Sequence, residues 1–449
     1  MLHLRSSQFS RVMVKLGPVF SVRHLLVLSL AINVSLMLTV IRERVKVEEI
    51  LNMFSTKLQL ATVSPSTGDG ETTDNGEAII NLDHGDPTMY EKYWQRMGDK
   101  TTVVISGWQF TSYFSDPKNL CWFLEPELAE EVVRLHRVVG NAITKDYHIV
   151  VGTGSSQLFQ AALYALSSDA SEPMSVVSAA PYYSSYPVIT DCLKSGLYKW
   201  EGDAQAFDKS GPYIELVTSP NNPDGFVRQS VVNRSGGILV HDLAYYWPQY
   251  TPITTPADHD LMLFTVSKTT GHAGMRIGWA LVKDEIIARK IVKYIELSTI
   301  GVSKDSQLRA AKVLRAVSDS CGVAHPFKEE TFFGFSHHSM ESRWMLLREA
   351  VNRSGIFSLP EFTPGFCNFW NRVFEPLPAF AWLKCGDGIE DCESFLRGHK
   401  IWTRSGRYFG VSPSYVRISM LDRDRTFNLF VKRLSRIRSQ RRMRLEHVD

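Results

Sequence analysis

Short apolar runs alternate with longer amphipathic segments from Ile79 onward, and this alternation constrains the fold more than any other feature of the sequence. The segment from Pro126 to Ala142 is typical of a helix, because its apolar residues recur at three-to-four spacing. The expected strands are residues 149–151, 176–177, 214–216, 238–240, 261–266 and 277–281. Strands that alternate with helices predict an α/β fold with a mainly parallel, doubly wound sheet.

Changes in composition divide the chain into several parts. After about Ser303 the pattern becomes α+β, which predicts a second, smaller domain. The predicted parts are a signal anchor or transmembrane segment (1–45), a flexible linker (46–80), an amino-terminal arm (81–120), a large domain (121–302) and a small domain (303–449). With 449 residues, 44% of them hydrophobic, the chain can bury a core in each of two domains. Its formal charge of +3 gives no reason to expect a nucleic-acid partner.

An uncharged, mostly apolar run covers residues 24–41, which is close to the shortest helix that crosses a bilayer. A cleaved signal peptide or targeting segment is the alternative, but no small-x-small cleavage site follows the run. Basic residues flank it on both sides, so they leave its orientation open. We therefore expect an uncleaved anchor and a single-pass membrane protein, with the polar stretch 64–76 as a linker.

The six cysteines are scattered and show no paired zinc-type spacing, so the sequence predicts no metal site. Free buried thiols are the default expectation. A secretory-pathway location would allow Cys385 and Cys392 to form a disulfide.

One lysine, Lys268, stands between an apolar strand and a Gly-rich turn in the stretch from Thr265 to Trp279. A lysine amine in such a place can bind the aldehyde of pyridoxal phosphate covalently. Arg276 follows eight residues later and can pair with the phosphate of the same cofactor. An isolated Ser-Lys pair would be an ordinary surface loop, but the pattern Ser-Lys-x-x-Gly-His-x-Gly-x-Arg-x-Gly-Trp favours a cofactor site.

Two further polar residues follow apolar runs. Asn222 lies in a Pro/Asn/Gly stretch after the strand-like run 213–218, and Asp242 ends the run 237–242. In open α/β sheets such strand ends bind ligands. Asp242 can pair with the pyridine nitrogen and keep it protonated, which makes the ring an electron sink. An ordinary turn and a helix N-cap are the alternatives for these two residues.

Taken together, these residues give the chain a family resemblance. It resembles the fold-type-I pyridoxal-phosphate enzymes and, within them, the plant group that contains alliinase and the tryptophan aminotransferase-related proteins. The supporting segments are 81–88, 112–115, 151–157, 180–183 and 415–419, and the likeness runs from about Asn81 to about Arg438. The resemblance implies a large domain with a mainly parallel seven-stranded sheet flanked by helices, and a smaller α+β carboxyl-terminal domain.

The resemblance also implies roles for individual residues. Lys268, Asp242 and Tyr245 would be catalytic, with Lys268 as the general base. Asn222 and Tyr245 would hydrogen-bond the phenolic oxygen of the cofactor, and Tyr182 would stack on its ring. The phosphate would bind Gly154, Ser155, Ser156, Ser267 and Arg276, since a strand-to-helix turn offers free N–H groups to an anion.

Two more residues carry implied roles at the edges of the site. Arg417 would clamp the α-carboxylate of the substrate. Tyr113 would reach the phosphate of a neighbouring subunit, which implies a homodimer with shared sites. The alternatives are a structural ion-pair arginine and an ordinary core tyrosine.

The family implies transfer of the amino group of L-tryptophan to pyruvate, which gives indole-3-pyruvate and L-alanine for auxin synthesis at the endoplasmic reticulum. An alliinase-like lyase that cleaves the C–S bond of an S-alkyl cysteine sulfoxide is the alternative, since both reactions use the same cofactor residues. Alliinases carry a Cys-rich module ahead of the catalytic body, whereas no cysteine precedes Cys121 here, which favours the transaminase. A membrane-tethered binding protein without activity is disfavoured by the presence of both Lys268 and Asp242.

Overall fold

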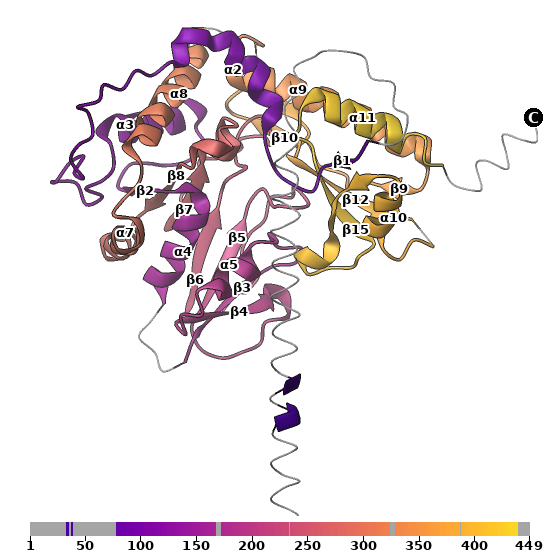
Figure 1. The fold of residues 1–449 in the computed structure, drawn as a ribbon, viewed down its shortest axis with the longest axis horizontal. Coiled ribbons are helices and arrows are strands. Elements are labelled where there is room, and N and C mark those ends of the chain that lie inside the picture. The colour runs from indigo at the N-terminus through magenta and orange to yellow at the C-terminus, as the bar shows by residue number, and fades with distance from the viewer. Residues whose placement is uncertain are drawn as a thin grey trace, which may run out of the picture. The chain divides into compact units, whose positions relative to one another are not determined.

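The computed structural model describes residues 33–35, 37–38, 78–167, 172–232, 234–323, 328–386 and 388–438. Residues 1–73 and 74–449 form separate units, and the architecture below is that of the second unit, the main body. In the main body, a large lobe contains a seven-stranded sheet and a small lobe contains a four-stranded sheet (Figure 1).

The large sheet has the strand order β2-β8-β7-β6-β5-β3-β4, and only β8 runs antiparallel to its neighbours. Its strands are β2 (His148–Gly152), β3 (Met174–Ser178), β4 (Tyr198–Asp203), β5 (Tyr213–Thr218), β6 (Gly237–Asp242), β7 (Leu261–Thr265) and β8 (Gly278–Val282). Strands β5, β7 and β8 are buried at every position, as expected of strands that helices cover on both faces. The expected mainly parallel sheet is confirmed.

Helices flank this sheet on its two faces (Figure 1). They are α3 (Pro126–Val139), α4 (Gly154–Leu166), α5 (Tyr186–Cys192), α6 (Val266–Thr269), α7 (Glu285–Thr299) and α8 (Lys304–Val323). Helix α3 begins with Pro126 in its first turn and ends at Val139, and the next residue, Gly140, has a φ of 71° in the left-handed region that glycine adopts easily. The expected helix therefore exists but ends three residues before Ala142.

The small lobe is an α+β layer made by the carboxyl-terminal part of the chain. Its sheet has the antiparallel order β14-β15-β12-β9. The elements are α9 (Phe332–Ser354), β9 (Phe357–Ser358), β10 (Gly365–Cys367), β11 (Arg372–Phe374), β12 (Phe380–Cys385), α10 (Cys392–Gly398), β13 (Ile401–Trp402), β14 (Arg404–Ser405), β15 (Tyr415–Ser419) and α11 (Asp424–Leu434). A disulfide joins Cys385 to Cys392, which is the pairing that the sequence left open.

The amino-terminal arm begins on the small lobe. Strand β1 (Ile80–Asn81) pairs in parallel with β13, and the backbone N–H of Ser419 donates to the carbonyl of Leu82 at 3.0 Å. Helix α2 (Glu91–Met97) follows, and the Trp94 indole N–H donates to the carbonyl of Thr270 in the large lobe at 2.9 Å. The arm thus connects both lobes and crosses the region where they meet.

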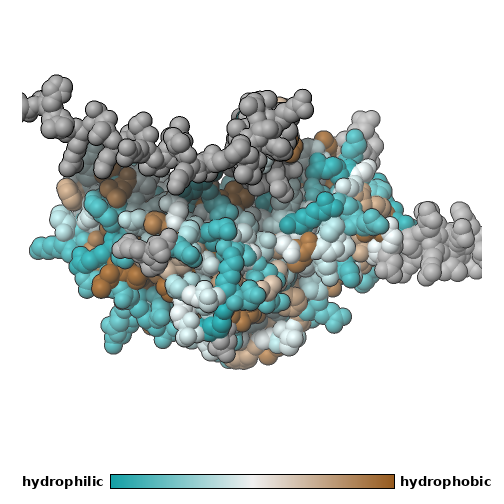
Figure 2. All heavy atoms as spheres, turned by 90° about the horizontal axis from the view of Figure 1, so that it is seen from below, coloured by the Kyte–Doolittle hydropathy of each residue, from teal (hydrophilic) through white to brown (hydrophobic). Residues whose placement is uncertain are grey.

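A single large hydrophobic cluster runs through both lobes and includes the fully buried Trp247, Trp279 and Trp344. The face shown in Figure 2 is mainly hydrophilic, with separate hydrophobic groups, as is usual for a globular surface.

The expected membrane anchor requires correction. Of residues 24–41, only 33–35 and 37–38 are described, and the rest of that run lies outside the described residues. Among the described residues, no helix is both long and apolar enough to cross a bilayer. This finding contradicts the prediction of a single-pass protein of the endoplasmic reticulum membrane. That prediction used only the apolarity of one run in the sequence.

Candidate active site

Three of the predicted site residues follow neighbouring strands of the large sheet. Asn222 lies in the loop after β5, Asp242 ends β6, and Lys268 lies in α6 directly after β7. Strands β5, β6 and β7 are adjacent and parallel, so these residues lie at the same edge of the sheet. This arrangement brings the three residues together at the carboxyl ends of the strands, where open α/β sheets bind ligands.

The Lys268 ammonium lies in a partly buried position where positive charge is disfavoured. Its Nζ donates to the carbonyl oxygen of Gly85 at 2.5 Å and lies 5.9 Å from the centre of the Tyr245 ring. Burial, together with the nearby guanidinium groups of Arg417 and Arg276, lowers the pKa of Lys268 to about 8. A much larger fraction of the amine is therefore neutral and nucleophilic at neutral pH than for an exposed lysine.

Asp242 is held by two donors but has no cation beside it. Its Oδ2 accepts from the Tyr186 hydroxyl at 3.0 Å, and its Oδ1 accepts from the backbone N–H of Ala244 at 3.2 Å. Burial raises the pKa of Asp242, although these hydrogen bonds oppose the change. Within the described part of the chain, no lysine, arginine or histidine forms an ion pair with this carboxylate. A protonated pyridine nitrogen would supply the charge that the site lacks.

Tyr245 and Asn222 form a second polar pair. Burial raises the pKa of Tyr245 well above its usual value, while a side-chain hydrogen bond with Asn222 acts in the opposite direction. Asn222 is itself buried, and its Oδ1 accepts from Nη1 of Arg417 at 3.1 Å. These two side chains can hydrogen-bond one ligand oxygen together.

Arg417 lies in β15 and is the predicted site residue that comes from the small lobe. Besides its contact with Asn222, its Nη2 donates to the carbonyl of Asp83 at 2.6 Å, and the guanidinium lies 4.1 Å from the centre of the Phe380 ring. Its Nε is buried without a hydrogen-bond partner among the described residues. Burial and the neighbouring Arg404 lower the pKa of Arg417 to about 10. A buried arginine without a carboxylate partner is suited to binding a ligand carboxylate.

The predicted phosphate-binding residues converge at the start of α4. A Cβ added to Gly154 would lie only 2.3 Å from Nη2 of Arg276, so the guanidinium lies directly against this glycine. Nη1 of Arg276 donates to Ser267 Oγ at 3.5 Å. Ser155 and Ser156 occupy the next positions of the first turn, where backbone N–H groups have no intrahelical partner. The guanidinium, the hydroxyls and the helix terminus are groups that could hold a phosphate.

Pyridoxal phosphate fits these residues on three counts. The buried amine of Lys268 lies beside two guanidinium groups and is poised to lose its proton. The buried carboxylate of Asp242 lacks a positive partner among the described residues. The phosphate cradle exists because Gly154 has no side chain, since a Cβ there would displace Arg276.

Tyr182 packs against Trp200 and Gly410. Its ring lies 4.9 Å from that of Trp200, and a Cβ on Gly410 would collide with it. The next residue, Tyr183, has its ring 5.3 Å from Tyr186, and its charge influences the pKa values of Tyr245 and Arg417. Tyr183 is therefore a second candidate for the ring-stacking role, and the assignment of Tyr182 stays a prediction. Sequence could not separate two adjacent tyrosines, because only packing decides which one faces the site.

Tyr113 does not meet the other site residues within one chain. It is 69% exposed and belongs to an arm segment with several exposed apolar side chains. Its assignment to a neighbouring subunit stays a prediction.

The sequence did not single out four residues that the structure brings to the site. The carbonyls of Asp83 and Gly85 accept from Arg417 and Lys268, respectively. Tyr186 bonds Asp242, and Phe380 lies under Arg417. Asp83 and Gly85 lie in the segment 81–88 that carried the family resemblance, whereas Tyr186 and Phe380 had no signal beyond their aromatic character.

Known proteins resemble this chain over most of its length. A family model described as "Allinase" matches residues 80–438. Tryptophan aminotransferase-related protein 2 of Arabidopsis thaliana is 61% identical over 426 residues, which cover 92% of this chain and 96% of that protein. Alliin lyase of Allium cepa is 37% identical over 348 residues, which cover 75% of this chain and 71% of that protein.

Solved structures share the fold at low sequence identity. An aspartate aminotransferase variant of Thermus thermophilus superposes with a TM-score of 0.57 at 16% identity, covering 80% of this chain and 91% of that one. An aspartate aminotransferase of Thermotoga maritima superposes with a TM-score of 0.55 at 18% identity, covering 81% of this chain and 92% of that one. The fold is fold type I of the pyridoxal-phosphate enzymes, and pyridoxal phosphate is the implied cofactor. The extent of the family match, from residue 80 to residue 438, shows that the chain belongs to the alliinase family.

Proposed function

We propose that this protein is a pyridoxal-phosphate-dependent aminotransferase that converts L-tryptophan and pyruvate to indole-3-pyruvate and L-alanine, as a step of auxin biosynthesis. The observation that carries the proposal is the 61% identity, over nearly the full length of both chains, to a protein named for tryptophan aminotransfer. The geometry of Lys268, Asp242 and Arg417 supports aminotransfer but leaves the amino acid open, because side-chain pockets determine that preference.

When bound, pyridoxal phosphate supplies an aldehyde that takes up the amino group and a ring that accepts the electron pair released at the substrate Cα. Asp242 is proposed to hold the proton on the ring nitrogen, since its carboxylate is buried and lacks another cation among the described residues. Asn222 and Tyr245 would donate hydrogen bonds to the phenolic oxygen. Ser155, Ser156, Ser267 and Arg276 would hold the phosphate.

Arg417 and Lys268 are proposed to act on the substrate itself. Arg417 would bind the α-carboxylate with its two terminal nitrogens and release the carbonyl of Asp83 that it now contacts. This pairing would fix the orientation of the Cα–H bond. Lys268, with its pKa lowered to about 8, would then act as the general base that takes the proton from the substrate Cα.

An alliinase-like lyase is the second candidate, because loss of the same Cα proton also precedes cleavage of a C–S bond. Its support is the 37% identity to alliin lyase of Allium cepa. The higher identity and coverage of the aminotransferase-related protein favour aminotransfer.

We also propose a homodimer in which each chain contributes Tyr113 to its partner's phosphate site. Exposure of Tyr113 and of neighbouring apolar side chains in the arm supports this proposal.

The test is a pair of assays on the same purified protein. One contains L-tryptophan and pyruvate, and the other contains an S-alkyl-L-cysteine sulfoxide. We expect indole-3-pyruvate and alanine in equal amounts in the first and no ammonia in the second. A Lys268→Ala protein serves as the control for both. Ammonia and pyruvate from the sulfoxide, without indole-3-pyruvate from tryptophan, would decide for the lyase.

A further inference from the structure

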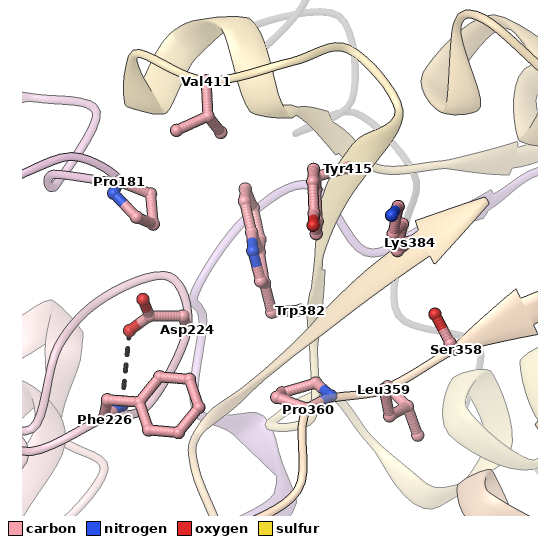
Figure 3. Close-up of a pocket in the computed structure, with 10 residues that line it drawn as sticks. All are labelled: Pro181, Asp224, Phe226, Ser358, Leu359, Pro360, Trp382, Lys384, Val411 and Tyr415. Carbon is pink, nitrogen blue, oxygen red and sulfur yellow. Dashed lines mark hydrogen bonds between the residues drawn. The ribbon is translucent and has the colours of Figure 1, made fainter. Parts of the chain in front are cut away.

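A pocket of about 370 Å³ lies beside the candidate active site, between the loops after β3 and β5 and the small-lobe sheet (Figure 3). Pro181, Asp224 and Phe226 line it from the large lobe, while Trp382, Lys384 and Tyr415 line it from the small lobe. None of these residues is among those that we assign to the cofactor or to the substrate. The volume is within the range of small-molecule sites in proteins.

The small-lobe wall of this pocket is aromatic. The rings of Trp382 and Tyr415 are stacked, with centroids 5.4 Å apart and planes inclined by 12°. Their orientation follows from the sheet register, because Trp382 pairs with Arg417 and Lys384 pairs with Tyr415 on the same face of β12 and β15. Figure 3 shows the two rings side by side in the pocket. Such a wall favours a planar apolar ligand.

The charge that remains in the pocket is positive. Asp224 is neutralised, because its Oδ2 accepts from Arg228 at 2.5 Å and its Oδ1 accepts from Asn221 at 2.8 Å. Lys384 is exposed, and its ammonium lies 5.6 Å from the centre of the Tyr415 ring. Among the described residues no carboxylate pairs with Lys384. The pocket therefore combines one uncompensated cation with a flat aromatic surface.

We propose that this pocket binds a small aromatic carboxylate, with the ring against Trp382 and Tyr415 and the carboxylate on Lys384. A charge-assisted hydrogen bond to the ammonium would orient the acid group, and burial of the ring would supply most of the affinity. A neutral aromatic compound would lose the charge-assisted hydrogen bond to the Lys384 ammonium. An aliphatic acid would lose the contact with the aromatic wall.

The pocket shares its wall with the candidate substrate site. Trp382 lies directly across from Arg417 in the sheet, and the Phe409 ring is 5.3 Å from both the Trp382 ring and the Arg417 guanidinium. Asp224 is two residues after Asn222, which bonds Arg417. An occupant therefore lies on the same face of the small-lobe sheet as the proposed carboxylate-binding arginine, next to it. This ligand site goes beyond the proposed function and does not depend on it.

The test is calorimetric titration of the holoenzyme with 3-phenylpropionate, 3-phenylpropan-1-ol and cyclohexanepropionate. Lys384→Gln is the informative variant, because the side chain is exposed and outside the proposed catalytic machinery. Lys432→Gln makes the same charge change at another exposed lysine of the small lobe. Binding of the probe at the proposed substrate site, on Arg417, contributes equally to all three proteins, because neither substitution changes that residue.

We expect Lys384→Gln to weaken binding of 3-phenylpropionate about tenfold, while Lys432→Gln leaves it unchanged. The alcohol should bind the original protein about as weakly as the acid binds Lys384→Gln, and the cyclohexane acid should bind more weakly than the phenyl acid. Equal affinity of the phenyl acid for the original protein and for Lys384→Gln would overturn the proposal, as would no binding to either. Because the measurement is binding, this result is independent of whether tryptophan is the substrate.

Discussion

At the scale of single residues, the unusual feature of this protein is that two cations are buried near each other. The pKa values of Lys268 and Arg417 are both lowered, to about 8 and about 10, with burial as the main cause. Burying like charges costs folding free energy, and the described residues give neither of them a carboxylate in hydrogen-bond contact. A ligand that brings a phosphate and a carboxylate would relieve this cost, so the destabilised residues indicate where it binds.

The lowered pKa of Lys268 predicts how cofactor capture depends on pH. Only the neutral amine attacks an aldehyde, so the rate of capture should rise with pH and level off above about 8, well below the ordinary value of 10.5. Stopped-flow absorbance after mixing apoprotein with pyridoxal phosphate measures this rate. Replacing Arg417 by Gln should move the midpoint to higher pH, since it removes a neighbouring positive charge. A midpoint near 10.5 in the original protein would contradict the burial of this amine.

The same shift affects stability. Between about pH 8 and 10.5 the unfolded chain binds more protons at Lys268 than the folded one, so this residue makes the apoprotein more stable as pH rises through that window.

Arg417→Gln should also impair the reaction. Loss of the paired N–H donors weakens carboxylate binding and misorients the Cα–H bond, so KM should rise and kcat fall, with kcat/KM lower by about 100-fold. Steady-state kinetics with the amino-acid substrate measures both constants. Arg397→Gln is the control, because that arginine is exposed and pairs with Glu393 within one helix. Unchanged constants for Arg417→Gln would remove it from the substrate site.

At the scale of elements, strand ends and one helix terminus assemble the site. Strands β5, β6 and β7 present Asn222, Asp242 and Lys268 at one edge, and the start of α4 faces Arg276. The antiparallel β8 makes this possible, because its first residue, Gly278, leaves room for the backbone of Gly154 and Ser155. Close backbone approach at the phosphate cradle therefore depends on missing side chains.

Gly154→Ala tests the phosphate cradle. Gly154 has a φ of 73°, and an added Cβ would push Arg276 away, so pyridoxal phosphate should dissociate about 10- to 100-fold more readily. Gly140→Ala is a matched control, because its φ is 71° and its Cβ would meet no atom within 4 Å. Both substitutions should cost about 1 kcal/mol of stability from the left-handed backbone. Cofactor affinity from fluorescence titration should change only in Gly154→Ala, and equal changes in both proteins would refute the cradle.

At the scale of the whole molecule, the amino-terminal arm exposes several large apolar side chains. Its segment after α2 exposes Val104 by 83%, Trp108 by 77% and Tyr113 by 69%. Large apolar side chains in such numbers on one segment are typical of a surface that meets another chain. The proposed dimer would bury them and complete each phosphate site with the partner's Tyr113.

Shared sites predict that two defective chains rescue each other. Chains with Tyr113→Ala and chains with Lys268→Ala should each be nearly inactive as homodimers. Mixed under conditions that exchange subunits, they should form heterodimers with one site that has both Lys268 and Tyr113 intact. Activity should therefore return to at most about half of normal per heterodimer. If Tyr113 served its own chain, the mixture would stay as inactive as its components.

The local sequence determined most strands of the large sheet and the nature of the cofactor. Apolar runs specified the strands β2, β3, β5, β6, β7 and β8, and the spacing around Lys268 indicated a covalent cofactor, because both signals lie within a few neighbouring residues. The edge strand β4 was missed, since its sequence Tyr-Lys-Trp-Glu-Gly-Asp mixes charged with aromatic residues and is only partly buried.

Other features were decided only by tertiary structure. They include the different ring neighbours of Tyr182 and Tyr183, the disulfide between Cys385 and Cys392, and the contact of Arg417 with Asp83. Each of them depends on how distant segments pack. For the apolar run 24–41, hydropathy alone predicted a membrane helix, whereas no helix among the described residues is long and apolar enough to cross a bilayer. Periodicity is set by neighbours along the chain, whereas the direction of a side chain is set by neighbours in space, and only the folded chain defines those.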